Sequence, residues 1–455
     1  MRNTRGNIIA TLRSGPLSAA EIAARLQIAS STVSRNLNAI TDKVIKAGEG
    51  RATKWHLIRP VAPLAGAWQW PIYRVNASGN TEKIAHLYSV YPAESYLVEY
   101  FRSNNIPNLQ LSFGEWTFYE SLPWWLTDMR PQGFLGRSLA QQLHKQGEHF
   151  NVDPRQWHED QVLAVLVRFP QDHIGNLLVG ESAYQLWQQR DQHQKISDAQ
   201  AAALAEAIAN GEHFESSAQG EQPKFMARLA EGDCLVKFSG AITQVQLDSV
   251  ANRWADLLQA EALAATILNN NFARIAAPSR CWQANQRTFM ASLRFDRNNA
   301  GGRKGVISFT SLDAEFVGKG SEPWPVIVNS LYQQGIVSEQ AVSQCKIAWA
   351  FGQLIANSDM HLGNISVMSS GSRPYEIAPI YDMLPMHFAP TPAGDLPSKP
   401  RAIPQHPAVA PLYWQMALPV AQQFWQAVLL HPQISTHFKV LAAQQQQLLT
   451  HLHQE

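Results

Sequence analysis

Hydrophobic positions in the first forty residues recur with the period of a helix in three short stretches. A Gly-Pro pair at 15–16 ends the first stretch. Ser18 and Glu21, three residues apart, predict a capping box at the start of the second. Ser30 is positioned to cap the third, in which the apolar positions 33, 37 and 40 share one face. We therefore expect three consecutive helices.

The segments 44–46 and 54–58 predict a β-hairpin after these helices, and the opposite face of the third helix is polar. Residues 1–60 hold ten Lys and Arg against three Asp and Glu, a balance of +7 in a chain whose net charge is +1. A basic module on an acidic body is typical of nucleic-acid binding. We predict that the side chains that contact phosphates and base edges are Ser31, Thr32, Ser34, Arg35 and Asn38 of the helix and Arg51 and Lys54 of the hairpin.

The segment IASSTVSRNLNAI resembles the recognition helix of the winged helix-turn-helix domains of bacterial regulators. That resemblance covers about 55 residues and implies DNA binding, with Arg35 as the first choice for a DNA contact. A helical protein–protein module of the same shape is the alternative.

The middle of the chain alternates in the manner of strands in WPIYRVN, EKIAHLYSVY and SYLVEYF, with Gly79-Asn80 as a hairpin turn. Helices are expected at 137–146, 159–168 and 198–210. Trp124 and Trp125 are expected to pack in the core. The pattern indicates no chemistry for this region.

A lysine and a glutamate stand where apolar residues are expected. Lys237 lies in the strand CLVKFSG, which is predicted to be buried on both faces, so that it needs an anionic partner. Glu261 falls on the apolar stripe of a helix expected over 246–268, where a carboxylate needs a cation. The two are predicted to pair, as do the lysine and glutamate that position ATP phosphates in protein kinases. The alternatives are a lysine at a strand edge and a glutamate that faces water.

An apolar helix is expected to end near residue 357, and the loop after it offers Asp359, His361 and Asn364. Asp359 and Asn364 are five residues apart in a loop, a spacing that matches the catalytic loop of kinases. Asp382 is expected at the end of a following strand, where a second carboxylate can bind a metal that bridges ATP phosphates. Mg²⁺ favours such sparse carboxylate ligation. A structural loop with capping Asp and Asn is the alternative.

The ordered motifs SAQGEQPK, LVKF, LRFDR, NSDMHLGNISV and IYDMLP resemble those of HipA-family serine/threonine toxin kinases, in particular YjjJ-like members with a winged helix-turn-helix domain at the N-terminus. The D-x-H-x-x-N form also resembles the catalytic loop of phosphoinositide-type kinases. The resemblance extends from about residue 70 to the C-terminus. It implies ATP and Mg²⁺ as cofactors and transfer of the γ-phosphate to a serine or threonine of a cellular protein.

The same resemblance implies a role for each matching residue. Asp359 would be the catalytic base, and Asn364 and Asp382 the Mg²⁺ ligands. Ser217, or its neighbour Ser216, would match the loop serine that family members autophosphorylate, where a phosphate adds about −1.5 to −2 charge and would expel the loop. The residues implied to bind ATP are Lys237, Glu261, Gly220, Gln222, Lys224, Ser292, Phe295 and His361, with a hinge against adenine at 291–295.

The implied fold is of the α+β class. It comprises a winged helix-turn-helix domain over 1–60, a HipA-like N-terminal subdomain over 61–209, a mixed α/β kinase N-lobe over 210–295 and an α-rich kinase C-lobe over 296–455. Seven prolines between 390 and 411 are expected to form an ordered linker in the last of these.

Several partners are expected. DNA is expected at residues 1–60, and the family resemblance adds a helix-turn-helix antitoxin. Helix-turn-helix proteins often dimerise on palindromes, so a homodimer is a further expectation. No membrane is expected, because we find no run of about 18 uncharged apolar residues. Three scattered cysteines, no secretory signal and no metal spacing favour a reducing cytoplasm.

Two other functions stay open at this point. One is a DNA-binding transcriptional regulator with an inactive kinase fold. The presence of four residues argues against it: Lys237, Asp359, Asn364 and Asp382. The other is a metal-dependent nuclease built from Asp359, His361 and Asp382, which would leave Lys237 and Glu261 unexplained.

Overall fold

The computed structural model describes residues 4–101, 115–190, 195–209, 222–242 and 248–452. By its internal contacts the chain divides into two compact units. The first comprises Met1–Arg130 with Gln156–Arg190, and the second comprises Pro131–Arg155 with Asp191–Glu455. Both units combine helices with antiparallel sheets, so the predicted α+β class is confirmed.

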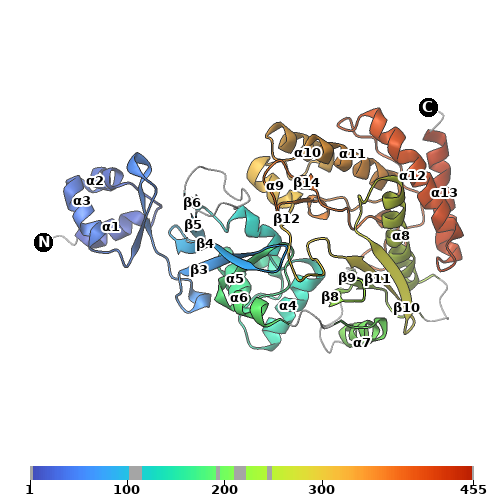
Figure 1. The fold of residues 1–455 in the computed structure, drawn as a ribbon, viewed down its shortest axis with the longest axis horizontal. Helices are drawn as coiled ribbons and strands as arrows, with labels where there is room; N and C mark the ends of the chain where they lie inside the picture. Colours follow the sequence, from blue (N-terminus) through green and yellow to red (C-terminus); the bar gives the residue numbers. More distant parts are fainter. Residues whose placement is uncertain (1–3, 102–114, 191–194, 210–221, 243–247, 453–455) are drawn as a thin grey trace. The chain divides into compact units, whose positions relative to one another are not determined.

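The first unit begins with three helices and a hairpin (Figure 1). The capping box at the second helix is present: the Ser18 backbone N–H donates to Glu21 Oε2 at 2.6 Å, and the Glu21 N–H to Ser18 Oγ at 3.2 Å. The prediction that Ser30 caps the third helix is wrong, because Ala29 is the extended N-cap and Ser30 the first helical residue. The elements are α1 (Thr4–Leu12), α2 (Ala19–Leu26), α3 (Ser30–Asn38), β1 (Val44–Ala47) and β2 (Lys54–Leu57).

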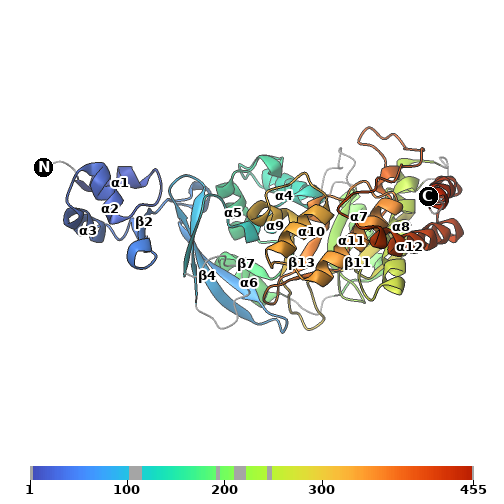
Figure 2. The ribbon, with the colours of Figure 1, turned by 90° about the horizontal axis from the view of Figure 1, so that it is seen from above.

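A five-stranded antiparallel sheet of order β6-β5-β4-β3-β7 follows in the same unit. Gly79, with a positive φ of 83°, forms the predicted turn between β3 and β4. Helix α6 packs on β3 and β7 (Figure 2). Trp124 and Trp125 are buried as expected. The elements are β3 (Gln69–Val75), β4 (Thr81–Val90), β5 (Ser95–Tyr100), β6 (Trp116–Tyr119), β7 (Leu177–Val179), α5 (Glu159–Arg168) and α6 (Gly180–Gln189).

A buried arginine joins the hairpin to this sheet. Arg59, just beyond β2, donates through two nitrogens to the carboxylate of Asp160 in α5 and through Nε to the Val90 carbonyl. The Tyr96 hydroxyl donates to the same carboxylate at 2.6 Å. Because removing one partner of a buried pair leaves an uncompensated charge, this contact holds the helical module and the sheet together.

The second unit contains a four-stranded antiparallel sheet of order β10-β11-β9-β8. One face packs an aromatic core against α7, with Phe238 and Phe289 in contact. Since successive strand residues alternate between faces, Lys237 lies on the other face, against which α8 packs. The elements are α4 (Gly133–Lys145), α7 (Asp198–Ala209), β8 (Lys224–Arg228), β9 (Asp233–Phe238), α8 (Val250–Asn271), β10 (Ser279–Ala284) and β11 (Arg287–Leu293).

The rest of this unit is mainly helical. Helix α11 packs between α10 and α12, and α12 also contacts α8 and α13 (Figure 1). In the described part of the chain, no helix has the length and apolar character needed to span a bilayer. The elements are β12 (Val306–Ser308), α9 (Phe309–Phe316), α10 (Trp324–Gln333), α11 (Glu339–Leu354), β13 (Ser366–Met368), β14 (Glu376–Ile377), α12 (Pro411–Leu430) and α13 (Thr436–Leu452).

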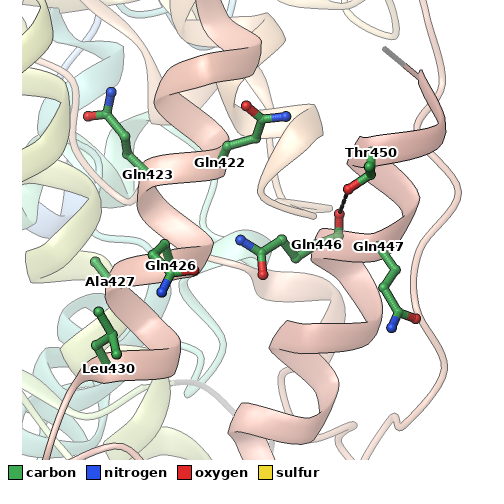
Figure 3. A pocket seen from close by; sticks show the side chains of 8 residues that line it. All are labelled: Gln422, Gln423, Gln426, Ala427, Leu430, Gln446, Gln447 and Thr450. Carbon is green, nitrogen blue, oxygen red and sulfur yellow. Dashed lines mark hydrogen bonds between the residues drawn. The ribbon is translucent and has the colours of Figure 1, made fainter. Parts of the chain in front are cut away.

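Glutamine side chains line a groove between α12 and α13 (Figure 3). None of the predicted site residues lies in it. In the glutamine run 444–447, Gln444 and Gln447 are exposed, whereas the side chain of Gln445 is fully buried. The groove is lined by Gln422, Gln423, Gln426, Ala427, Leu430, Gln446, Gln447 and Thr450.

The buried imidazole of His56 in β2 predicts acid sensitivity of the first unit. Burial lowers its pKa to about 4, with the Lys54 charge adding to the effect, and the described residues give its Nδ1 no hydrogen-bond partner. The unfolded chain, with a pKa near 6.5, therefore binds an extra proton between these values. We expect the free energy of unfolding to fall by about 3 kcal/mol as the pH falls from 6.5 to 4. Urea unfolding across this window measures the loss, and an equal loss in His56→Phe would contradict the assignment.

Candidate active site

A buried ammonium group is the centre of the second unit. Lys237 Nζ lies 2.7 and 2.8 Å from the two carboxylate oxygens of Glu261 and 2.5 Å from Oδ1 of Asp382. Lys237 and Glu261 are each 5% exposed. The predicted pairing of Lys237 with Glu261 is therefore present, and Asp382 joins it from a third element.

Local structure explains why these groups meet. Lys237 points away from the aromatic face of the sheet because its neighbours Val236 and Phe238 fill that face. Glu261 lies midway along α8, whose first turn is capped by the Ser249 side chain. The helix was expected over 246–268, and the described helix is Val250–Asn271, so that prediction placed its ends three or four residues too early.

The electrostatics of the cluster follow from burial and opposite charge. Burial alone would lower the pKa of Lys237, but the Asp382 and Glu261 carboxylates outweigh it and raise that pKa above its usual value. For Asp382 the nearby ammonium of Lys237 outweighs burial and lowers its pKa. Burial raises the pKa of Glu261, and Lys237 offsets this only in part. Lys237 therefore stays charged in the folded protein.

Asp382 was predicted to lie at a strand end, but the structure places it in a loop. Strand β14 ends at Ile377, and Asp382 has a positive φ of 52°, a conformation that Asp tolerates better than most residues. The backbone of Ile380 exchanges hydrogen bonds with Ile275 and Ala277, which ties the loop to the sheet side of the unit. A local sequence pattern does not reveal this detour, because a long-range backbone contact causes it.

The loop after α11 is organised by two asparagines. Asn357 Oδ1 accepts from the Asp359 N–H at 3.0 Å, and Asn357 Nδ2 donates to the Asp382 carbonyl at 3.3 Å. Asn364 Nδ2 donates to the Asp359 carbonyl at 2.8 Å, which leaves its Oδ1 available to a metal. Asp359 and Asn364 are thus held in one turn, and Asn357 links that turn to the loop of Asp382.

The Asp359 carboxylate is the accessible member of the site. Its side chain is 51% exposed, and the His361 Nε2 lies 4.0 Å away. His361 Nδ1 accepts from the Gly363 N–H, and its carbonyl accepts from the Trp324 indole. A carboxylate fixed through its own backbone and open to solvent can accept a proton from an approaching hydroxyl.

The structure places the other predicted ATP residues at several positions around the sheet. Lys224 pairs with Lys237 across β8 and β9, so both cations lie on one face of the sheet. The Lys224 charge adds to the lowering of the Asp382 pKa and opposes the rise of the Glu261 pKa. Phe295 stacks on Tyr381 with ring centroids 5.8 Å apart, beside Asp382. Gln222 donates to the Phe238 carbonyl, and Ser292 lies in β11 opposite Leu235. Gly220, Ser216 and Ser217 lie outside the described residues.

The predicted DNA contacts belong to the first unit, whereas the Lys237 cluster belongs to the second. Ser31, Ser34, Arg35 and Asn38 are exposed on α3 and Thr32 is partly so, opposite the buried Val33 and Leu37. Arg51 and Lys54 are exposed in the hairpin. The structure therefore presents all seven side chains on the surface of one small module.

Sequence reasoning missed Asn357 and Arg401. Asn357 is 1% exposed, and its position directly after an apolar helix in IANSD was the one available signal. Arg401, from the proline-rich segment, donates to the Asn357 carbonyl at 3.3 Å. No local pattern indicates that contact, because 44 residues separate its partners.

Comparison with known proteins adds the following findings. Residues 67–188 match the family model of the YjjJ-like toxin middle domain, and residues 216–445 match that of the HipA-like C-terminal domain. Toxin YjjJ of Escherichia coli K12 is 38% identical over 439 residues, which cover 95% of this chain and 94% of that protein. The family resemblance inferred from the motifs is confirmed.

Two solved structures are similar more distantly. A chain from the HipA, HipB and operator DNA complex of Shewanella oneidensis MR-1 has a TM-score of 0.47 at 13% identity, covering 83% of this chain and 95% of that one. The Helicobacter pylori proinflammatory kinase CtkA has a TM-score of 0.35 at 13% identity, covering 51% of this chain and 92% of that one.

The Lys237 cluster predicts a specific pattern of stability changes. Lys237→Met leaves two carboxylates without their cation, so we expect a loss of about 3–5 kcal/mol of unfolding free energy. Adding Glu261→Gln should restore part of it, because one of the stranded charges is removed. Urea unfolding of the single and double variants measures the coupling, with Lys224→Met as a matched control on the neighbouring strand. Strictly additive losses would contradict the predicted coupling.

Proposed function

We propose, on the premise that the chain belongs to the family of YjjJ-like toxins with a HipA-like C-terminal domain, that it is an ATP-dependent serine/threonine protein kinase that also binds DNA. The single observation that carries the kinase part is the convergence of Lys237, Glu261 and Asp382 beside the turn that holds Asp359 and Asn364. In the domain scheme proposed here, residues 210–295 and 296–455 form its two lobes.

The donor set suits a nucleotide and a hard divalent cation. The Asp382 carboxylate and the Asn364 amide oxygen are oxygen ligands of the kind that Mg²⁺ prefers. When bound, Mg²⁺ would neutralise phosphate charge between them. Lys237 and Lys224 place two ammonium groups on the sheet face against which α8 packs with Glu261, where phosphate oxygens could be held. Gln222, Ser292, Phe295 and His361 are proposed to complete the ATP site.

Asp359 is proposed to act as the catalytic base. In this proposal its exposed carboxylate orients the substrate hydroxyl and accepts its proton, while Asn357 and Asn364 hold its backbone. Lys237 would keep the transferring phosphate in line, and Glu261 would keep Lys237 from relaxing toward Asp382 alone. A metal-dependent nuclease explains this cluster less well, because a nuclease site does not require a buried lysine and glutamate.

The targets and partners are proposed from the family and the chemistry together. A cellular serine or threonine protein and the chain's own Ser217 or Ser216 would receive the phosphate. A helix-turn-helix antitoxin and DNA are proposed as partners, on the family resemblance and the basic N-terminal module. A homodimer and a cytoplasmic location complete the proposal.

The DNA-binding part rests on the exposed polar face of α3 and the basic hairpin. The buried side of α3 is apolar, and the seven predicted contact residues lie on the accessible side of the module, within the proposed winged helix-turn-helix domain 1–60. A recognition helix of this kind can lay its side chains in a DNA groove.

The kinase proposal is tested by Asp359→Asn. We expect the wild-type chain to gain phosphate at Ser217 or Ser216 with ATP–Mg²⁺, and the variant to lose about 10²- to 10⁴-fold in rate, because a positioned base contributes that much. Intact mass and phosphopeptide mapping measure the transfer.

Asp395→Asn, a change of an exposed carboxylate in the same unit, is the matched control. A variant as fast as the wild type would remove Asp359 from the base role. A phosphatase-treated wild-type chain that gains no phosphate, and transfers none to any protein substrate, would favour the regulator with an inactive kinase fold.

The DNA proposal is tested by Arg35→Ala. If Arg35 contacts a phosphate, the slope of log affinity against log salt should fall by about one, because each neutralised phosphate contributes about 0.9. Fluorescence anisotropy on a random-sequence duplex measures the slope. Arg25→Ala, which removes an equal charge from α2, should leave it nearly unchanged. A wild-type chain without affinity for duplex DNA would instead favour a protein–protein module.

A further inference from the structure

The proline-rich segment before α12 is attached to the last helix by one buried side chain. Gln445 of α13 is fully buried; its Oε1 accepts from the Arg401 backbone N–H at 2.8 Å, and its Nε2 donates to the Arg401 carbonyl at 2.9 Å. One amide thus satisfies both backbone groups of one residue, as a neighbouring strand would. This contact fixes the point from which the Arg401 side chain extends.

The Arg401 side chain reaches the end of α11. Its Nη1 donates to Gln353 Oε1 at 2.9 Å and to the Asn357 carbonyl at 3.3 Å. Gln353 in turn contacts the Met360 sulfur through its Nε2 at 3.4 Å. The guanidinium therefore contacts the turn directly at Asn357, before Asp359, and only through Gln353 at Met360, after it.

This cation is held by neutral groups. Burial lowers the pKa of Arg401, and the structure places no carboxylate within ion-pair distance of it among the described residues. An arginine nonetheless stays charged. Carbonyls at the C-terminal end of a helix attract a positive charge, so the end of α11 is a favourable place for it. Removing the guanidinium from water costs free energy, so its position depends on the oxygen atoms that it contacts.

The segment has two more anchors near the site. Arg253 of α8 donates through Nη1 to the carbonyls of Phe388 at 2.8 Å and Pro397 at 2.9 Å. A His387 ring nitrogen lies 3.0 Å from the Lys399 carbonyl, and the His387 N–H donates to the Ala356 carbonyl. Residues 387–401 therefore form a strap, tied at one side to the helix of Glu261 and at the other to the turn of Asp359.

We propose that Arg401, held by Gln445, is a positioning residue that sets the conformation of the turn carrying Asp359, so that the C-terminal helix α13 controls the geometry of the site. The route runs from Gln445 to Arg401 and then to Asn357. Asn357 orients both the Asp359 amide and the Asp382 carbonyl. The effect on catalysis rests on the proposed kinase function, whereas the effect on the turn does not.

Hydrogen exchange tests the effect on the turn without any assay of activity. In Arg401→Ala we expect the amides of residues 355–364 to exchange at least about tenfold faster, and those of α8 to be unchanged, because local opening involves only the released segment. Gln445→Met, which removes both backbone bonds at similar volume, should give the same local change. The double variant should exchange no faster than Arg401→Ala, because both act through one contact.

Kinetics tests the effect on catalysis. Arg401→Ala should lower kcat by about 10- to 100-fold, as misplacement by about 1 Å does, while KM for ATP changes less than about twofold. Methylguanidinium should restore part of kcat in Arg401→Ala but not in Gln445→Met, where the guanidinium is still present. Lys399→Ala and Gln444→Ala are matched controls, a neighbouring cation and a neighbouring exposed glutamine.

The outcomes separate the two proposals. Unchanged exchange at 355–364, or faster exchange throughout the unit, would overturn the positioning role. So would equal losses in kcat and ATP affinity without rescue by methylguanidinium. A wild-type chain that transfers no phosphate would remove the kinase function, and the exchange measurements would still decide the role of Arg401.

Discussion

The buried ammonium of Lys237 is the contact on which the second unit depends. It comes from a strand, and its two carboxylate partners come from a helix 24 residues later and from a loop 145 residues later. Because an unpaired buried charge costs several kcal/mol, the sheet, α8 and the Asp382 loop must meet in one arrangement for the fold to be stable. The same requirement places a strand lysine, a helix glutamate and a loop carboxylate together, the groups on which the proposed kinase function rests.

Helix α8 connects this contact to the rest of the unit. Glu261 faces the sheet, while Arg253, two turns earlier, holds the strap 387–401. Asp256 of the same helix accepts from the backbone and hydroxyl of Ser435, which caps α13, and burial raises its pKa to about 6. One helix therefore contacts the sheet, the strap 387–401 and the C-terminal helix.

The first unit combines a helical module with the five-stranded sheet to which Arg59 attaches it. Its helical module keeps an apolar side of α3 in a small core and leaves the polar side exposed, and Arg59 fastens the module to the adjoining sheet. The basic surface and the buried cluster lie in different compact units. The exposed side of the helical module and the buried Lys237 cluster therefore share no residues.

The sequence by itself determined the local elements and the identity of the unusual residues. The capping box, the hairpins and the two charges at apolar positions, Lys237 and Glu261, follow from short-range patterns and from the cost of burying charge. Helix ends were less certain, since Ser30 and the start of α8 shifted by one to four residues. The tertiary structure alone decided that Asp382 leaves its strand, that Asn357 bridges two loops and that Gln445 is buried against Arg401. Each of these rests on a contact between residues 25 to 145 positions apart, which no periodicity along the chain encodes.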